Sequence, residues 1–174
     1  MTTFTLAGGC FWCLDAVFRN LRGVTSSIVG YAGGSKADAD YYRVASGQTA
    51  HAESVQVRFD ESILPVDVLL DIFFTLHDPT TLNRQGADVG PQYRSAMFYE
   101  DDTQREQFES ARTRAAAIWD KPIVTEITKL DEFYIAESEH QDYYAQNPAN
   151  PYCAVVIDPK IVKVRHSFAS YFVT

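Results

Sequence analysis

The chain has 174 residues and a formal net charge of −8, with 46% hydrophobic and 22% charged residues. This composition fits one domain with a hydrophobic core and excludes an intrinsically disordered chain. The negative charge argues against a nucleic-acid binder and against binding to an anionic membrane, because both need a basic protein surface. No stretch has the length of a membrane span, and no signal peptide is visible at the N-terminus.

Hydrophobic spacing in the first hundred residues predicts six elements. Alternating or β-branched runs indicate strands, and apolar residues spaced three and four apart indicate helices. In chain order we expect a strand over 4–7, a helix over 11–21, strands over 24–31 and 52–59, a helix over 65–76 and a strand over 93–99. This β-α-β-β-α-β order is that of the split βαβ, or ferredoxin-like, fold, which is a two-layer sandwich.

The remaining segments are predicted to extend this core. Residues 78–92 form a long loop rich in Pro, Thr, Asn, Gly and Asp, and a loop of this length is usually functional or disordered. Beyond residue 100 we expect helices over 102–119, 137–146 and 161–173 and a strand over 123–128. No repeat or linker is visible, so the sequence predicts a single α+β domain over residues 1–174.

Residues 8–13 have the sequence Gly-Gly-Cys-Phe-Trp-Cys and place Cys10 where a helix begins. The exposed amides and the dipole of a helix start favour a thiolate, so we expect a lowered pKa for Cys10. Phe11 and Trp12 suit a small, partly apolar substrate, with core packing as the alternative. Cys13 lies one helical turn away, as in a Cys-x-x-Cys disulfide. The segment predicts a thiol-based redox enzyme.

The three cysteines are an odd number and too few for a disulfide scaffold. A reducing, cytoplasmic location is therefore expected.

Glu53 is the second candidate residue. It begins an alternating strand and shares one face with Val55, Val57 and Phe59. A carboxylate on an apolar face is partly desolvated, which raises its pKa and lets it act as an acid near neutral pH. The alternative is a side chain in water at a frayed strand end.

Other candidate groups lie in irregular segments, where functional residues are often displayed. Asp88 lies in the long loop, Tyr93 follows it, and Tyr41 lies in a polar stretch. A half-buried packing role is the expected one for each tyrosine taken singly. For His140, within a predicted helical segment, we expect a surface or capping position.

Eight short motifs stand in one order along the chain. They cover residues 9–12, 30–34, 51–53, 77–81, 83–90, 92–96, 133–137 and 140–141. Together they resemble peptide methionine sulfoxide reductase A from residue 8 to about residue 144, and residues 151–153 continue the resemblance. Several multi-residue motifs in the right order are far more specific than a lone Cys-x-x-Cys.

The resemblance implies reduction of the S epimer of methionine sulfoxide, free or protein-bound, to methionine. It implies that Cys10 attacks the sulfoxide sulfur and becomes a sulfenic acid. It also implies that Glu53 hydrogen-bonds and protonates the sulfoxide oxygen, assisted by Tyr41 and Tyr93. A second thiol then forms a disulfide with Cys10.

The resemblance also implies the binding groups and partners. Phe11 and Trp12 form an apolar pocket for the S-methyl group, and Asp88 and His140 support the site. Thioredoxin, or dithiothreitol in vitro, reduces the disulfide, and no bound cofactor or metal is implied. A monomer is expected because no exposed apolar stripe stands out.

The resolving thiol stays open between Cys13 and Cys153, or both in relay. Cys13 stands where most members carry glycine, and Asp15 where Glu is common. Cys153 follows an Asn- and Pro-rich stretch in the region where other members keep a recycling cysteine. The alternatives are an unreactive helix thiol for Cys13 and a buried small hydrophobe for Cys153.

Three other functions are weighed against the reductase. A general thiol–disulfide oxidoreductase needs only the Cys-x-x-Cys pair, and leaves Glu53 and the long loop unexplained. A metal-binding module would use Cys10, Cys13, His51 and His140, but zinc sites usually pair two close-spaced ligand couples, and here only one exists. A non-catalytic interaction module is the third.

Overall fold

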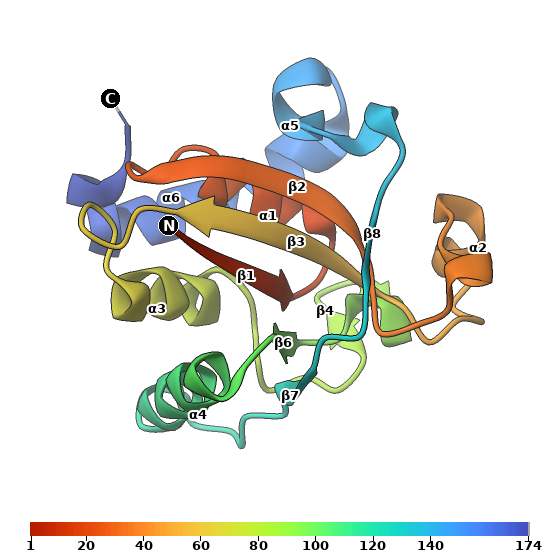
Figure 1. Ribbon diagram of the computed structural model, residues 1–174. Helices are drawn as coiled ribbons and strands as arrows, with labels where there is room; N and C mark the ends of the chain where they lie inside the picture. Colours follow the sequence, from red (N-terminus) through yellow and green to blue (C-terminus); the bar gives the residue numbers. More distant parts are fainter. Residues whose placement is uncertain (174) are drawn as a thin grey trace.

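Six strands form one curved sheet in the order β7-β6-β1-β3-β2-β8 (Figure 1). The computed structural model describes residues 1–173. The strands are β1 Thr2–Ala7, β2 Val24–Ala32, β3 Ala52–Phe59, β6 Ala96–Tyr99, β7 Glu126–Lys129 and β8 Phe133–Ile135. All neighbouring pairs are antiparallel except β6 and β7, which are parallel.

The four central strands carry the predicted topology. With α1 (Phe11–Phe18) and α3 (Val66–Leu76), they follow one another as β1-α1-β2-β3-α3-β6 and lie in the spatial order β6-β1-β3-β2. That is the order and direction of a split βαβ sandwich, so the predicted ferredoxin-like α+β class is confirmed. The outer strands β7 and β8 extend the sheet on both sides.

The hydrophobic core lies between one face of the sheet and the helices. Inward-facing side chains such as Phe4 and Val57 are fully buried against Leu14 of α1 and Phe73 of α3. The opposite face carries a smaller cluster of alanines with Phe98, packed against Leu130 and Phe133. This alternation along each strand is what places Glu53, one residue into β3, on the helix-covered face with Val55 and Val57.

The remaining helices surround this sandwich: α2 Tyr41–Ala45, α4 Asp102–Ala116, α5 Tyr143–Gln146 and α6 Asp158–Phe168. Asp40 begins α2, where its carboxylate accepts hydrogen bonds from two backbone amides, and Asp101 does the same for one amide at the start of α4. No helix within residues 1–173 has the length and apolar character to cross a membrane.

Several predicted boundaries are wrong for local reasons. The strand expected over 93–99 starts only at Ala96, because Pro91–Tyr93 forms a 3-10 turn. The helix expected over 11–21 ends at Phe18, and Gly23, with φ +92°, turns the chain into β2. The long loop contains a small hairpin of β4, Arg84–Gln85, and β5, Asp88–Val89.

The C-terminal third departs furthest from expectation. The helix expected over 137–146 is interrupted, because Asp142 takes a left-handed conformation with φ 52° between a 3-10 turn, Ser138–His140, and α5. The last helix begins at Asp158, earlier than expected, and follows a π-helical turn over Cys153–Ile157. Strand β8 has only three residues, and no periodicity predicted it.

Candidate active site

Cys10 caps the N-terminus of α1 at the end of a sharp turn from β1. Gly9 precedes it with φ +88°, and a Cβ on that residue would lie 2.8 Å from the Gln85 side chain. The carbonyl of Cys10 accepts a hydrogen bond from the Cys13 amide at 3.1 Å. The turn therefore brings a half-buried thiol to the helix start, as predicted from the glycines.

The turn packs on a buried imidazole that sequence reasoning did not identify. A Cβ on Gly8 would lie 2.9 Å from the His77 ring. The ring is held between the Phe73 carbonyl, 2.6 Å from Nδ1, and the Ser95 hydroxyl, 2.7 Å from Nε2. Burial lowers the pKa of His77 to about 3, so the ring is neutral and serves as a support.

Glu53 is only 2% exposed and reaches the start of α1. Its Oε1 accepts a hydrogen bond from the Phe11 amide at 3.2 Å. Burial raises the pKa of Glu53 to about 8, and the charge of Asp88 adds to this, while the Phe11 amide acts in the opposite direction. Glu53 therefore lies in the protein interior, not in water at a frayed strand end, and keeps its proton at neutral pH.

The thiols of Cys10 and Cys13 lie one helical turn apart, and each affects the pKa of the other. Burial raises the pKa of Cys10, and Cys13 adds to the rise, so the lowering expected from the helix start is wrong. The Trp12 backbone does favour the Cys10 thiolate, but the Phe11 amide is engaged by Glu53. The hydrogen bond from Cys10 lowers the pKa of Cys13. The pKa values of the two thiols therefore shift in opposite directions, upward for Cys10 and downward for Cys13.

The two aromatic residues between the thiols have different surroundings. Phe11 is fully buried and packs on Tyr31, with ring centroids 5.8 Å apart. Trp12 is half-buried and stacks on Tyr143 at 3.6 Å, with the ring planes 5° apart. Its Nε1 donates a hydrogen bond to Nδ1 of His140 at 3.2 Å. The two rings thus belong to an aromatic cluster at the start of α1.

His140 is 6% exposed, so the expected surface or capping position is wrong. Its ring stacks on Tyr41 with centroids 4.2 Å apart. Glu137, which the sequence reasoning missed, accepts a hydrogen bond from the Tyr31 hydroxyl at 2.9 Å and one from the Tyr41 amide at 3.0 Å. This carboxylate connects α2 to the sheet and so positions Tyr41.

Tyr41 and Tyr93 are both half-buried, and the Glu53 carboxyl group affects the pKa of both phenols. Burial raises the pKa of Tyr41 to about 12, and the charge of Glu53 adds to the rise. The same two causes raise the pKa of Tyr93. Both phenols therefore keep their protons and remain hydrogen-bond donors at neutral pH in the neighbourhood of Glu53.

A cavity of about 430 Å³ opens beside the two thiols. Its walls come from α1, the β4–β5 hairpin and the C-terminal segment: Cys10, Cys13, residues 85–88, Tyr152, Val155, Val156 and Lys160.

Tyr152 is a second residue of the site that sequence reasoning did not identify as a candidate. Its hydroxyl donates a hydrogen bond to Oδ2 of Asp88 at 2.9 Å and lies 3.7 Å from the Cys13 sulfur. The Pro-Tyr-Cys motif before Cys153 was the signal for it.

Cys153 is buried next to the same helix. It clusters with Cys13, Ala16 and Ile157, and its thiol donates a hydrogen bond to the Asn147 carbonyl at 3.4 Å. All three cysteines are free in this structure. The fold thus brings the predicted pair and the distant third thiol into one apolar cluster.

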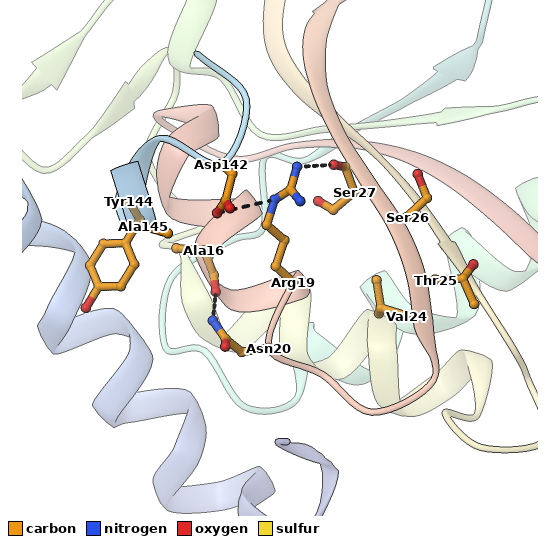
Figure 2. Close-up of a pocket in the computed structure, with 10 residues that line it drawn as sticks. All are labelled: Ala16, Arg19, Asn20, Val24, Thr25, Ser26, Ser27, Asp142, Tyr144 and Ala145. Carbon is orange, nitrogen blue, oxygen red and sulfur yellow. Dashed lines mark hydrogen bonds and ion pairs between the residues drawn. The ribbon is translucent and has the colours of Figure 1, made fainter. Parts of the chain in front are cut away.

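On another side of α1, a polar network holds the helix in place (Figure 2). Asp15 is 1% exposed and accepts hydrogen bonds from Arg19 at 2.9 Å, from Ser27 at 2.6 Å and from the Asp142 amide at 3.2 Å. Figure 2 shows the Arg19 guanidinium between Ser27 and Asp142, beside a cavity of about 380 Å³. The network joins α1 to β2 and to the segment that carries Tyr143.

The metal-binding alternative needs a free His51, and this ring is engaged on both sides. Nδ1 accepts a hydrogen bond from the Gly34 amide at 3.1 Å, and Nε2 lies 2.7 Å from the Ser35 carbonyl. Within residues 1–173, the one group of close His, Cys, Asp and Glu ligands comprises Glu137, Glu139 and His140, without a cysteine. The structure does not bring the proposed Cys–His set together.

Comparison with known proteins agrees with this arrangement. The family model for peptide methionine sulfoxide reductase matches residues 2–171. The peptide methionine sulfoxide reductase MsrA of Pseudarthrobacter chlorophenolicus is 56% identical over 171 residues, 98% of each chain. Mxr1 from Saccharomyces cerevisiae in reduced form has a TM-score of 0.82 at 35% identity, covering 86% of this chain and 87% of that one. Mxr1 in complex with Trx2 has a TM-score of 0.57 at 27% identity, covering 82% of this chain and 84% of that one.

The family match thus extends over nearly the whole chain. The chain belongs to the peptide methionine sulfoxide reductase family.

Proposed function

We propose that this chain reduces the S epimer of methionine sulfoxide to methionine, with Cys10 as nucleophile and Glu53 as acid. The observation that carries the proposal is the buried, protonated Glu53, hydrogen-bonded to the amide of the residue that follows Cys10. A sulfoxide oxygen is a poor leaving group until it is protonated, and a neutral carboxylic acid supplies that proton. The phenols of Tyr41 and Tyr93 donate further hydrogen bonds to this oxygen.

In the first step, Glu53 gives its proton to the sulfoxide oxygen and takes up the proton of the Cys10 thiol, whose sulfur attacks the sulfoxide sulfur. The hydroxyl group then passes to the Cys10 sulfur, as the sulfur–oxygen bond of the substrate and the bond between the two sulfurs break. The products are methionine and a Cys10 sulfenic acid. Phe11 and Trp12 hold the S-methyl group, which orients the sulfur towards Cys10. Asp88 and His140 support this arrangement, Asp88 through Tyr152 and His140 through Trp12.

In the second step, the Cys13 thiol attacks the sulfenic sulfur of Cys10. A disulfide forms and the hydroxyl group leaves with the Cys13 proton as water, so the protein has lost two electrons to the substrate. We propose Cys13 as the first resolving thiol because it lies one helical turn from Cys10 and its pKa is lowered. Cys153, packed against Cys13, then exchanges with it in relay, which leaves Cys10 free.

Thioredoxin is the proposed reductant, and dithiothreitol replaces it in vitro. The similarity to Mxr1, which has been solved in complex with Trx2, supports this partner. Two electrons from a thioredoxin dithiol reduce the disulfide and restore the reduced enzyme. We further propose a cytoplasmic location, a monomer and one catalytic domain over residues 1–174, with free or protein-bound methionine sulfoxide as substrate.

A single turnover tests the proposal. Reduced enzyme is mixed with methionine S-sulfoxide without a recycling reductant, methionine is quantified, and disulfides are mapped by mass spectrometry. We expect the first equivalent of methionine to appear with a Cys10–Cys13 bridge, which the relay then converts to a Cys13–Cys153 bridge, and no methionine with Cys10→Ser. Folded, reduced enzyme that forms no methionine would overturn the proposal, and insulin reduction would then test the general thiol–disulfide alternative.

A further inference from the structure

The cavity beside the thiols contains one positive and one negative side chain, Lys160 and Asp88. Asp88 accepts a hydrogen bond from Tyr152, and the half-buried Lys160 donates one to the Leu76 carbonyl at 3.2 Å. Among residues 1–173, no carboxylate forms a salt bridge with this ammonium. An ammonium and a carboxylate thus line one cavity without pairing with each other.

Lys160 comes from α6, far along the sequence from the other groups, and still acts on the reaction centre. Its charge favours the thiolate of Cys13 and disfavours protonation of His77. Of its three ammonium hydrogens, one goes to Leu76. A partly desolvated cation with unused donors is a ready partner for an anionic ligand.

The size and charge of the cavity define that ligand. A volume of about 430 Å³ suits a small molecule. A free α-amino acid carries an ammonium and a carboxylate on one carbon, which complements a cavity with Asp88 and Lys160. A methionine sulfoxide inside a protein chain has uncharged amides at both places and leaves Lys160 without a counter-charge.

We propose that Lys160 is a specificity-determining residue that binds the α-carboxylate of the substrate. Free methionine sulfoxide, and the C-terminal residue of a peptide, are then favoured over the same residue within a chain. The inference rests on the proposed function and concerns the same site. A substrate α-carboxylate is expected to face Lys160 while the sulfoxide sulfur faces Cys10, which lines the same cavity.

Four substrates distinguish the contribution of the substrate's α-carboxylate from that of its α-ammonium. They are methionine S-sulfoxide, its carboxamide, its N-acetyl derivative, and the N-acetyl derivative of the N-methylamide. The value of kcat/KM is measured for each with wild type, Lys160→Gln and Lys160→Arg. Lys163→Gln is the matched control, because Lys163 lies one turn along α6 with its Nζ 5.3 Å from the centre of the Trp119 ring, and it does not line the cavity.

We expect wild type to favour each substrate with a carboxylate about tenfold over its amide, which corresponds to one charge-assisted hydrogen bond. The ratio falls to about one in Lys160→Gln, is regained in Lys160→Arg and stays at the wild-type value in Lys163→Gln. An effect of Lys160→Gln on the pKa of Cys13 acts on all four substrates alike and cancels in the ratio. The N-acetyl derivative distinguishes a peptide C-terminus from the free amino acid.

Equal kcat/KM for acids and amides in wild type, or an unchanged preference in Lys160→Gln, would overturn the inference while leaving the reductase intact. Failure of wild type to reduce any of the four would overturn the proposed function, and this inference with it.

Discussion

The amide of Phe11 donates its hydrogen bond to the carboxyl group of Glu53, 3.2 Å away, although Cys10 is the N-cap residue of the same helix. The first amides of a helix lack partners within the helix and are directed at whatever stands in front of it. In this protein, the Phe11 amide holds the carboxyl group of Glu53, the proposed acid, instead of the sulfur of Cys10, the proposed nucleophile. The acid and the nucleophile are thereby held on either side of one peptide unit.

Replacing Glu53 by Gln is expected to lower the rate of the first turnover by roughly 10²- to 10⁴-fold, because the amide has a similar shape but no proton to transfer. The rate of methionine formation in rapid-quench experiments measures this. Glu106→Gln, an exposed change on α4, is the control and should match wild type. A Glu53→Gln rate near that of the control would remove Glu53 from the acid role.

The pH dependence of the first turnover is expected to follow the same group. Because burial holds the pKa of Glu53 at about 8, the group is protonated at neutral pH and loses its proton above that value. The rate should therefore fall as the pH rises through about 8. Glu53→Gln should lack this decline in single-turnover profiles from pH 6 to pH 9.5, and a rate that rises through that range in wild type would contradict the assignment.

Stability should change with pH for the same reason. Glu53 binds its proton more tightly when folded, with a pKa of about 8, than at its ordinary value of 4.5. Between these values the native state holds more protons than the unfolded state, so the Glu53 contribution to the free energy of unfolding falls as pH rises. Urea unfolding at pH 5 and pH 8.5 should show a smaller pH effect in Glu53→Gln than in wild type. An equal effect in both would count against the raised pKa.

The roles of Cys13 and Cys153 can be distinguished by what each serine variant does after the first turnover. We expect Cys13→Ser to form one equivalent of methionine and then to stop with thioredoxin as the only reductant. Cys153→Ser should also keep the first turnover and should accumulate the Cys10–Cys13 disulfide if the relay is required. Steady-state rates and disulfide mapping distinguish the two. Full thioredoxin-supported turnover by Cys13→Ser would assign the resolving role to Cys153.

The network at the base of α1 predicts a difference between two aspartates. Removing the buried charge in Asp15→Asn leaves Arg19 without its main partner and should lower the free energy of unfolding by about 3 kcal/mol. Asp142 pairs with the same arginine at 3.7 Å but is 42% exposed, so Asp142→Asn should cost less than about 1 kcal/mol. Urea unfolding at neutral pH compares them, and equal losses would contradict the network.

Elements with a strong repeating pattern were predictable. The strand over 52–59 agrees with β3 in both bounds, because its alternation is uninterrupted, and that alternation also predicted a buried Glu53. Strand β8 has three residues and forms only because β2 offers a free edge, which no local pattern reveals. Elements defined by tertiary partners were thus the ones that sequence reasoning missed.

The same distinction holds within the site. Cys10, a residue in a dense motif, was found directly, but the direction of its pKa shift was not, because the sequence does not show that the thiol is buried or that the Phe11 amide is taken by Glu53. Glu137 and Tyr152 act through partners about a hundred and more than sixty residues away, respectively. Their roles depend on packing that follows only from the complete fold.

The close approach of Gly8 to His77 has an evolutionary consequence. Any side chain at position 8 would overlap the imidazole, and a smaller residue at position 77 would leave a void under the reactive turn. Neither position can change alone without loss, so among related sequences the two should vary together or not at all. The turn that carries Cys10 therefore depends on Gly8 and His77 together, although the two residues lie about seventy positions apart in the chain.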